Sequence, residues 1–127
     1  MWDDREEAKV LYVQTHGVSD PGRSATPFFL AASAAAMDCQ VGIYFTMYGP
    51  TLLQKDIVDK LGPKGDRGQP LRYFIDQATD LGVRLLVCQP SLELNDLALE
   101  DLIDGVEMIG GAAFNDYAIR ADAVVSF

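Results

Sequence analysis

Cys88 is the residue in this sequence whose type and position best suit chemistry. It closes the apolar run Val83–Cys88 (VRLLVC), which is typical of a strand buried on both faces. In parallel α/β sheets, ligands and reacting groups gather at the carboxyl ends of the strands, and helix N-termini meet there. Their partial positive charge favours a thiolate over a thiol, so Cys88 is a candidate nucleophile or persulfide carrier. The alternative is a structural role, because cysteine is also a small buried hydrophobe.

Three polar residues are candidate binding partners of this thiol. His16 follows the expected strand Lys9–Thr15, so it lies at the same edge of the sheet as Cys88 and could assist it. A histidine in a turn can equally be a capping or solvent-facing residue. Gln89 and Ser91 come directly after the thiol and are candidates by proximity.

Cys39 is expected to be structural. It precedes the strand predicted over Gln40–Thr46, which places it at the opposite edge of the sheet from Cys88. A disulfide between the two cysteines is therefore not expected. Two cysteines and a single histidine are too few for a zinc site, and we expect no bound metal.

The sequence lacks the signatures of several other functions. No GxxxxGK[ST], GxGxxG or GxSxG motif is present, so no nucleotide or other cofactor is predicted. A formal net charge of −9 disfavours nucleic acid and anionic membrane surfaces as partners. No apolar run approaches the roughly 20 residues that span a bilayer. Because the first residues are charged rather than apolar, we expect a reducing, cytoplasmic setting in which thiols stay free.

Strand and helix patterns alternate along the 127 residues, which predicts one domain over residues 1–127. The fold expected is a three-layer α/β/α sandwich with a mostly parallel sheet of four or five strands, in an order that the pattern does not determine. The exposed loop expected over Gly62–Pro70 has glycine at every third position but too few triplets for collagen. Strands are predicted at 9–15, 40–46, 83–88, 106–108 and 122–127, and helices at 25–37, 50–61, 70–82, partly 92–106, and 111–121.

The Ala-rich helix at 25–37 is apolar nearly all round, which predicts burial on more than one side. One sheet face cannot cover every side of such a helix. Met47, Tyr48 and Leu52 add apolar surface in a nearby loop. We therefore expect a homo-oligomer, a trimer or a hexamer, although local helices and the Gly62–Pro70 loop could cover this surface instead.

The chain resembles the small DsrE/DsrF/TusD-type sulfur-relay proteins over almost its whole length. The resemblance rests on the first strand, polar turn and Ala-rich helix (KVLYVQTHGVSDPGRSATPFFLAASAAAM), on VRLLVC, and on the closing GGAAFNDYAIRADAVVSF. In such proteins a cysteine after this third strand accepts sulfane sulfur as a persulfide and passes it to a partner's cysteine. Cys88 occupies that position. The resemblance also implies trimers or hexamers, and partners that are sulfur donor and acceptor proteins or small sulfane-sulfur compounds.

Two functions remain open at this point. In the first, the protein is a persulfide carrier or sulfurtransferase acting through Cys88. In the second, it is a non-catalytic oligomeric module of the same fold that binds a small ligand or a protein, and Cys88 is a buried structural residue.

Overall fold

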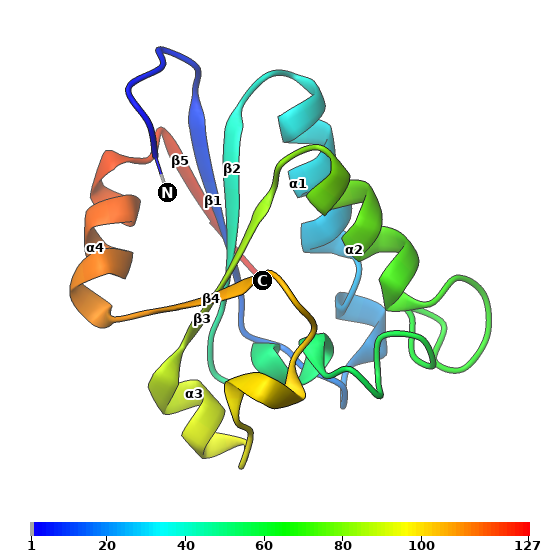
Figure 1. The fold of residues 1–127 in the computed structure, drawn as a ribbon. Helices are drawn as coiled ribbons and strands as arrows, with labels where there is room; N and C mark the ends of the chain where they lie inside the picture. The colour runs from blue at the N-terminus through cyan, green and yellow to red at the C-terminus, as the bar shows by residue number, and fades with distance from the viewer. Residues whose placement is uncertain (1) are drawn as a thin grey trace.

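The computed structural model describes residues 2–127 as five parallel strands in the order β4-β3-β2-β1-β5 (Figure 1). The α/β/α sandwich expected from the alternating pattern is confirmed, with five strands. The strands are β1 (Lys9–Gln14), β2 (Gln40–Phe45), β3 (Arg84–Cys88), β4 (Val106–Ile109) and β5 (Ala123–Ser126).

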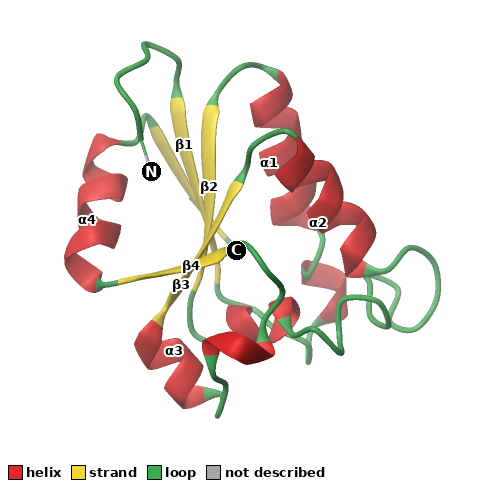
Figure 2. Cartoon of the chain, viewed as in Figure 1, coloured by secondary structure: helices red, strands yellow, loops and turns green. Residues whose placement is uncertain are grey.

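Helices cover the two faces of this sheet unequally. Helices α1 (Thr26–Ala36) and α2 (Leu71–Asp80) pack together on one face, and α4 (Gly111–Arg120) lies on the other (Figures 1 and 2). The short helix α3 (Gln89–Leu94) continues from the carboxyl end of β3. Its placement puts the residues that follow β3 at the edge of the sheet, clear of both covering layers.

Within the chain, helix α1 packs against both the sheet and α2, and its burial against a second subunit stays a prediction. Pro27, Phe28, Ala31 and Ala34 face the core, spaced as one stripe of a helix. Phe29 is 59% exposed, on the outer side. The outer side of α1 therefore remains uncovered by the described residues.

The helix expected over residues 50–61 is wrong in type. A 3-10 helix, η2 (Gly49–Leu53), is followed by an extended Gln54 and then by turns. The cause is backbone pairing with a distant segment. Gln54 forms an antiparallel bridge with Leu102, and the Ile103 amide donates to the Leu53 carbonyl. In a continuous helix these backbone amide and carbonyl groups would bond to one another within the helix. The helical spacing of the apolar residues therefore indicates that they are buried, not that the segment is a helix.

The segment after β3 also differs from expectation. Its helix starts at Gln89 rather than near residue 92, and ends at Leu94. A 3-10 turn, η3 (Leu99–Asp101), follows. The early start matters for the site, because Cys88 is thereby both the last residue of a strand and the residue that caps a helix.

The face under α4 is held by aromatic contacts. Tyr44 lies against Phe114 of α4 with ring centroids 4.3 Å apart, and Trp2 packs edge-on against Tyr117 at 6.2 Å. Such pairs contribute about 0.5–1.5 kcal/mol each beyond area burial. Cys88 belongs to this same cluster. Within residues 2–127, no helix is long and apolar enough to cross a membrane.

Candidate functional site

Cys88 lies at the carboxyl edge of the sheet, as its place at the end of an apolar run predicts. It pairs with Ile109 of β4, and β2 flanks β3 on the other side. Its side chain is 8% exposed, and both cysteines are free. The thiol is thus enclosed by protein on most sides while remaining at the edge where the strands end.

Three hydroxyl groups surround the sulfur. The Ser91 Oγ atom is 2.6 Å from Cys88 Sγ, and the Thr46 Oγ1 atom is 3.5 Å from it. The Tyr44 side chain lines the same cavity as the thiol. Ser91 comes from α3, one helical turn beyond the thiol, and the other two come from the end of neighbouring β2. The sheet and the helix therefore bring hydroxyls from two separate segments onto one sulfur.

Ser91 joins these groups to the turn that follows β2. Its Oγ atom is 3.2 Å from Thr46 Oγ1 and accepts a hydrogen bond from the Met47 amide at 2.8 Å. The Asn95 side-chain amide donates to the Met47 carbonyl at 2.8 Å. Met47 has a positive φ of 55°, a conformation that costs energy for a residue with a side chain. The two bonds from α3 hold it there.

The hydroxyls set the charge preference of the thiol. Burial by itself raises the pKa of Cys88, but hydrogen bonds from Ser91, Thr46 and Tyr44, together with the Ser91 backbone amide, outweigh it and lower the pKa. The pKa of Tyr44 is raised, by burial first and by its hydrogen bond to Cys88 second, so Tyr44 stays protonated and able to donate. The environment favours a thiolate whose charge is held by donors.

A cavity of about 330 Å³ opens beside the sulfur. Tyr44, Gln89 and Ile109 contribute to its lining together with Cys88, and Gly111, the first residue of α4, lies on its wall. The partial positive end of α4 therefore borders the same space as the thiol. The cavity has room for a sulfur atom added to Cys88 and for part of the molecule that delivers or removes it.

The residues predicted from sequence are placed differently by the structure. Ser91 touches the thiol and Gln89 lines the cavity. His16 instead contacts the Thr15 hydroxyl at 3.4 Å and Arg23 at 3.5 Å. It follows β1, which is separated from β3 by β2, and no contact between His16 and Cys88 is present among the described residues.

Thr46 and Tyr44 are the site residues that sequence reasoning missed. Thr46 follows β2 directly, so the strand-end rule used for Cys88 would have identified it. Tyr44 stands two residues before Thr46 and points to the same face of the sheet. What the sequence withheld was the strand order, since only adjacency of β2 and β3 brings these hydroxyls to the thiol.

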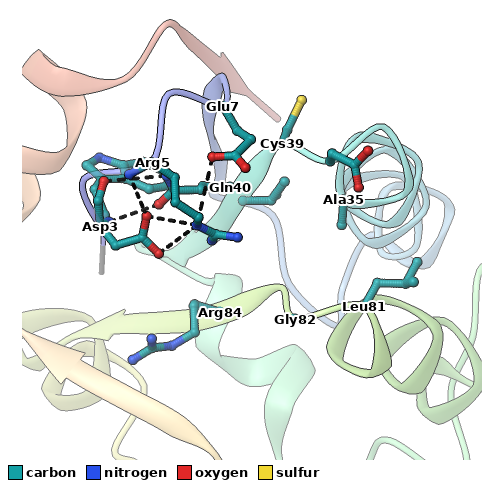
Figure 3. Close-up of a pocket in the computed structure, with 12 residues that line it drawn as sticks. Asp3, Arg5, Glu7, Ala35, Cys39, Gln40, Leu81, Gly82 and Arg84 are labelled. Atoms are coloured by element: carbon teal, nitrogen blue, oxygen red, sulfur yellow. Dashed lines mark hydrogen bonds and ion pairs between the residues drawn. The ribbon is translucent and has the colours of Figure 1, made fainter.

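Cys39 lies at the amino edge, beside a larger cavity of about 620 Å³ (Figure 3). On one side of this cavity Asp3 and Glu7 surround the Arg5 side chain, with an Asp3–Arg5 ion pair at 2.9 Å. Arg84 lies on another side, where it is paired with Glu107 of β4. Both arginines already have carboxylate partners, and this cavity does not reach the Cys88 thiol.

The parallel five-stranded sheet with helices on both faces makes this a small α/β protein, and the comparisons show its family. Residues 8–127 match the model of the DsrE/DsrF-like family, so the chain belongs to that family. The sulfur carrier protein DsrE2 of Allochromatium vinosum is 26% identical over 155 residues, covering 92% of this chain and 96% of that protein.

Solved structures show the same fold at low sequence identity. The ychN protein from Escherichia coli superposes with a TM-score of 0.76 at 16% identity, covering 95% of this chain and 99% of the other. A protein of unknown function from Methanobacterium thermoautotrophicum, MTH1491, gives a TM-score of 0.63 at 15% identity, covering 96% and 100%.

Proposed function

We propose that this protein is a sulfur carrier that accepts sulfane sulfur on Cys88 as a persulfide and passes it to a partner thiol. The observation that carries the proposal is the set of hydroxyls around the sulfur, with Ser91 Oγ at 2.6 Å, which favours the reactive thiolate. The likeness to a protein named as a sulfur carrier supports it.

The transfer needs no external oxidant. The Cys88 thiolate attacks the outer sulfur of a donor persulfide or polysulfide, a new S–S bond forms, and the donor's S–S bond breaks to release the donor as a thiolate. An acceptor thiolate then attacks the outer sulfur of the Cys88 persulfide. Cys88 leaves as a thiolate, which the hydrogen bonds from Ser91, Thr46 and Tyr44 stabilise again.

Intact mass spectrometry tests this directly. The protein is incubated with polysulfide or thiosulfate, freed of excess reagent and weighed before and after reduction. We expect a reducible gain of one sulfur atom on the wild type and on Cys39→Ser, and none on Cys88→Ser. Equal gains on Cys88→Ser and the wild type would refute the proposal.

The competing proposal, a binding module with a structural Cys88, draws on the 8% exposure of that side chain. Alkylation separates the two. A small neutral reagent labels Cys88 in the native Cys39→Ser protein if the thiol functions in exchange. If Cys88 is structural, labelling requires denaturation.

We also propose that the protein assembles as a homotrimer or homohexamer. Large apolar side chains remain exposed on the outside of both layers, with Met37 at 75% and Ile119 at 82%. Val124 of edge strand β5 is 46% exposed. Light scattering behind size exclusion tests the assembly, and a monomer mass at micromolar concentration would contradict it.

The partners proposed are sulfur donor and acceptor proteins or small sulfane-sulfur compounds. A thiol that cycles between free and persulfide forms requires a reducing compartment, so we propose a cytoplasmic location. Both cysteines being free agrees with that setting.

A further inference from the structure

Apolar side chains are exposed next to the thiol. Met47 is 49% exposed, Tyr48 is 54% exposed and Leu94 of α3 is 52% exposed. Thr46, which precedes the first two, lies 3.5 Å from the Cys88 sulfur. The segments that carry these side chains are joined by the hydrogen bond from Asn95 to the Met47 carbonyl. They form one apolar strip beside the site.

This strip is already held in shape without a partner. The Met47 amide and carbonyl are bonded to the side chains of Ser91 in α3 and of Asn95, which follows α3, each at 2.8 Å. Those bonds fix the turn in its left-handed conformation. A partner that docks here therefore meets a formed surface and loses little entropy to ordering it.

The charged residues of α3 and of the segment after it are all acidic, and Lys55 lies beside Glu100 and Asp101. Glu93 and Asp96 flank Leu94 and are exposed. No Lys or Arg occurs between Arg84 and Arg120. Over residues 89–104 the charged residues are all acidic, namely Glu93, Asp96, Glu100, Asp101 and Asp104. A partner that approaches Cys88 along α3 thus meets the negative charges of Glu93 and Asp96, which attract cations and repel anions.

We propose that Met47, Tyr48, Glu93, Leu94 and Asp96, here called the α3 rim, dock a basic segment of the acceptor protein that carries its cysteine next to an apolar side chain. The inference rests on the proposed function, since it names the partner of the same thiol. The apolar side chain packs on the strip, and Lys or Arg residues pair with Glu93 and Asp96. The docked segment then brings its cysteine to the sulfur of Cys88.

The test measures thiol exchange, so it does not depend on sulfur loading. In a Cys39→Ser background, Cys88 is converted to its neutral thiopyridine mixed disulfide. It is then reacted with two cysteine peptides of equal length, each with one leucine beside the cysteine and either lysines or glutamates around it. Attack of the peptide thiolate on the Cys88 sulfur forms a peptide–protein disulfide and releases thiopyridone, whose absorbance gives the rate.

We expect the lysine peptide to react about tenfold faster than the glutamate peptide at low salt, in the range of electrostatic steering. The difference should nearly vanish in 1 M NaCl, where the Debye length is about 3 Å. Glu93→Lys with Asp96→Lys should reverse the preference. Asp80→Lys, an equally exposed acidic position at the far end of α2, should leave it unchanged.

A second pair of variants tests the apolar contact of the α3 rim. Leu94→Ser should slow both peptides several-fold, whereas Leu81→Ser, at 51% exposure on the amino edge, should slow neither. Equal rates for the two peptides at low salt would overturn the proposal. It would also fall if Asp80→Lys changed the peptide preference as much as Glu93→Lys with Asp96→Lys does. If Leu94→Ser changed the light-scattering mass instead of the rate, the rim would be a contact between copies of this chain, and the proposal would also fall. A persulfide assay that failed while the exchange preference held would refute sulfur carriage and leave the docking surface standing.

Discussion

The two cysteines of this chain lie at opposite edges of one sheet, and their surroundings differ accordingly. Cys39 sits in the turn before β2, half-buried, and in residues 2–127 its sulfur has no hydrogen-bond partner. Cys88 ends β3, more deeply buried, with hydroxyls from Ser91, Thr46 and Tyr44 around it. Exposure alone would rank Cys39 as the more reactive thiol. The direction of the strands favours Cys88 instead, because the carboxyl edge of the sheet brings hydroxyl groups and the start of a helix close to its thiol.

The largest expected effect is a difference in sulfur uptake between single-thiol proteins. The Cys39→Ser protein, which keeps Cys88, should react with polysulfide at neutral pH at least about tenfold faster than the Cys88→Ser protein, because only its thiol has donors that favour the thiolate. Timed quenching and mass spectrometry give the two rates. Comparable rates would mean that the hydroxyls do not activate Cys88.

Ser91→Ala should have the next largest effect. Removing the closest donor raises the pKa of Cys88, so the inflection of its alkylation rate moves to higher pH. At neutral pH the rate should fall about tenfold, matching loss of one hydrogen bond to a charged group at about 1.5 kcal/mol. Ser33→Ala, on the exposed side of α1, is the matched control. Ser91→Thr keeps a hydroxyl and should restore most of the rate, which a purely structural serine would not predict.

Tyr44→Phe should also raise the pKa of Cys88, but by less than Ser91→Ala does, because Ser91 and Thr46 remain as donors. We expect about a threefold lower alkylation rate at neutral pH, within the range of a single neutral hydrogen bond. The ring contact with Phe114 is kept by phenylalanine, so the melting temperature should change little. Tyr12→Phe, another buried tyrosine on the neighbouring strand, controls for the loss of a hydroxyl. A matching drop with Tyr12→Phe would show a general packing effect.

Cys39→Ser should have the smallest effect. The free energy of unfolding should change by about 0.5 kcal/mol, as for substitutions away from buried networks, and sulfur uptake by Cys88 should be unchanged. Urea unfolding followed by circular dichroism measures the first quantity. Lost uptake in this variant would show that the two edges are functionally linked.

The position of Cys88 at the carboxyl edge was predictable from the sequence, but the side chains around its thiol were not. VRLLVC marks a buried strand, and the general rule for parallel sheets places the residue at its end on the functional edge. Tyr44 of β2 and Thr46, which follows β2, precede Cys88 in the chain by about forty residues, 42 for Thr46, and strand order alone decides that they lie beside the sulfur. Without the strand order, a His16–Cys88 pair was also conceivable from the sequence. The structure places β2 between the strands that these two residues follow and end.

The errors in secondary structure share one physical origin. Leu53, Ile57 and Leu61 follow a helical period because they face the core, and that spacing predicted a helix. The backbone there is instead paired with residues near Leu102, an interaction invisible in local sequence.

Ser91 has a consequence for how the site handles changing charge. Its oxygen accepts a hydrogen bond from the Met47 amide. Its single hydroxyl proton can point to either of two neighbours, the Cys88 sulfur or the Thr46 oxygen. When the sulfur is a thiolate, that proton turns to it; when the charge moves outward onto an added sulfur atom, the proton is free to turn to Thr46. The site can thus follow the movement of charge by rotating hydroxyl hydrogens, without displacing heavy atoms. Low reorganisation of this kind suits a group that must take up and release its cargo with nearly equal ease.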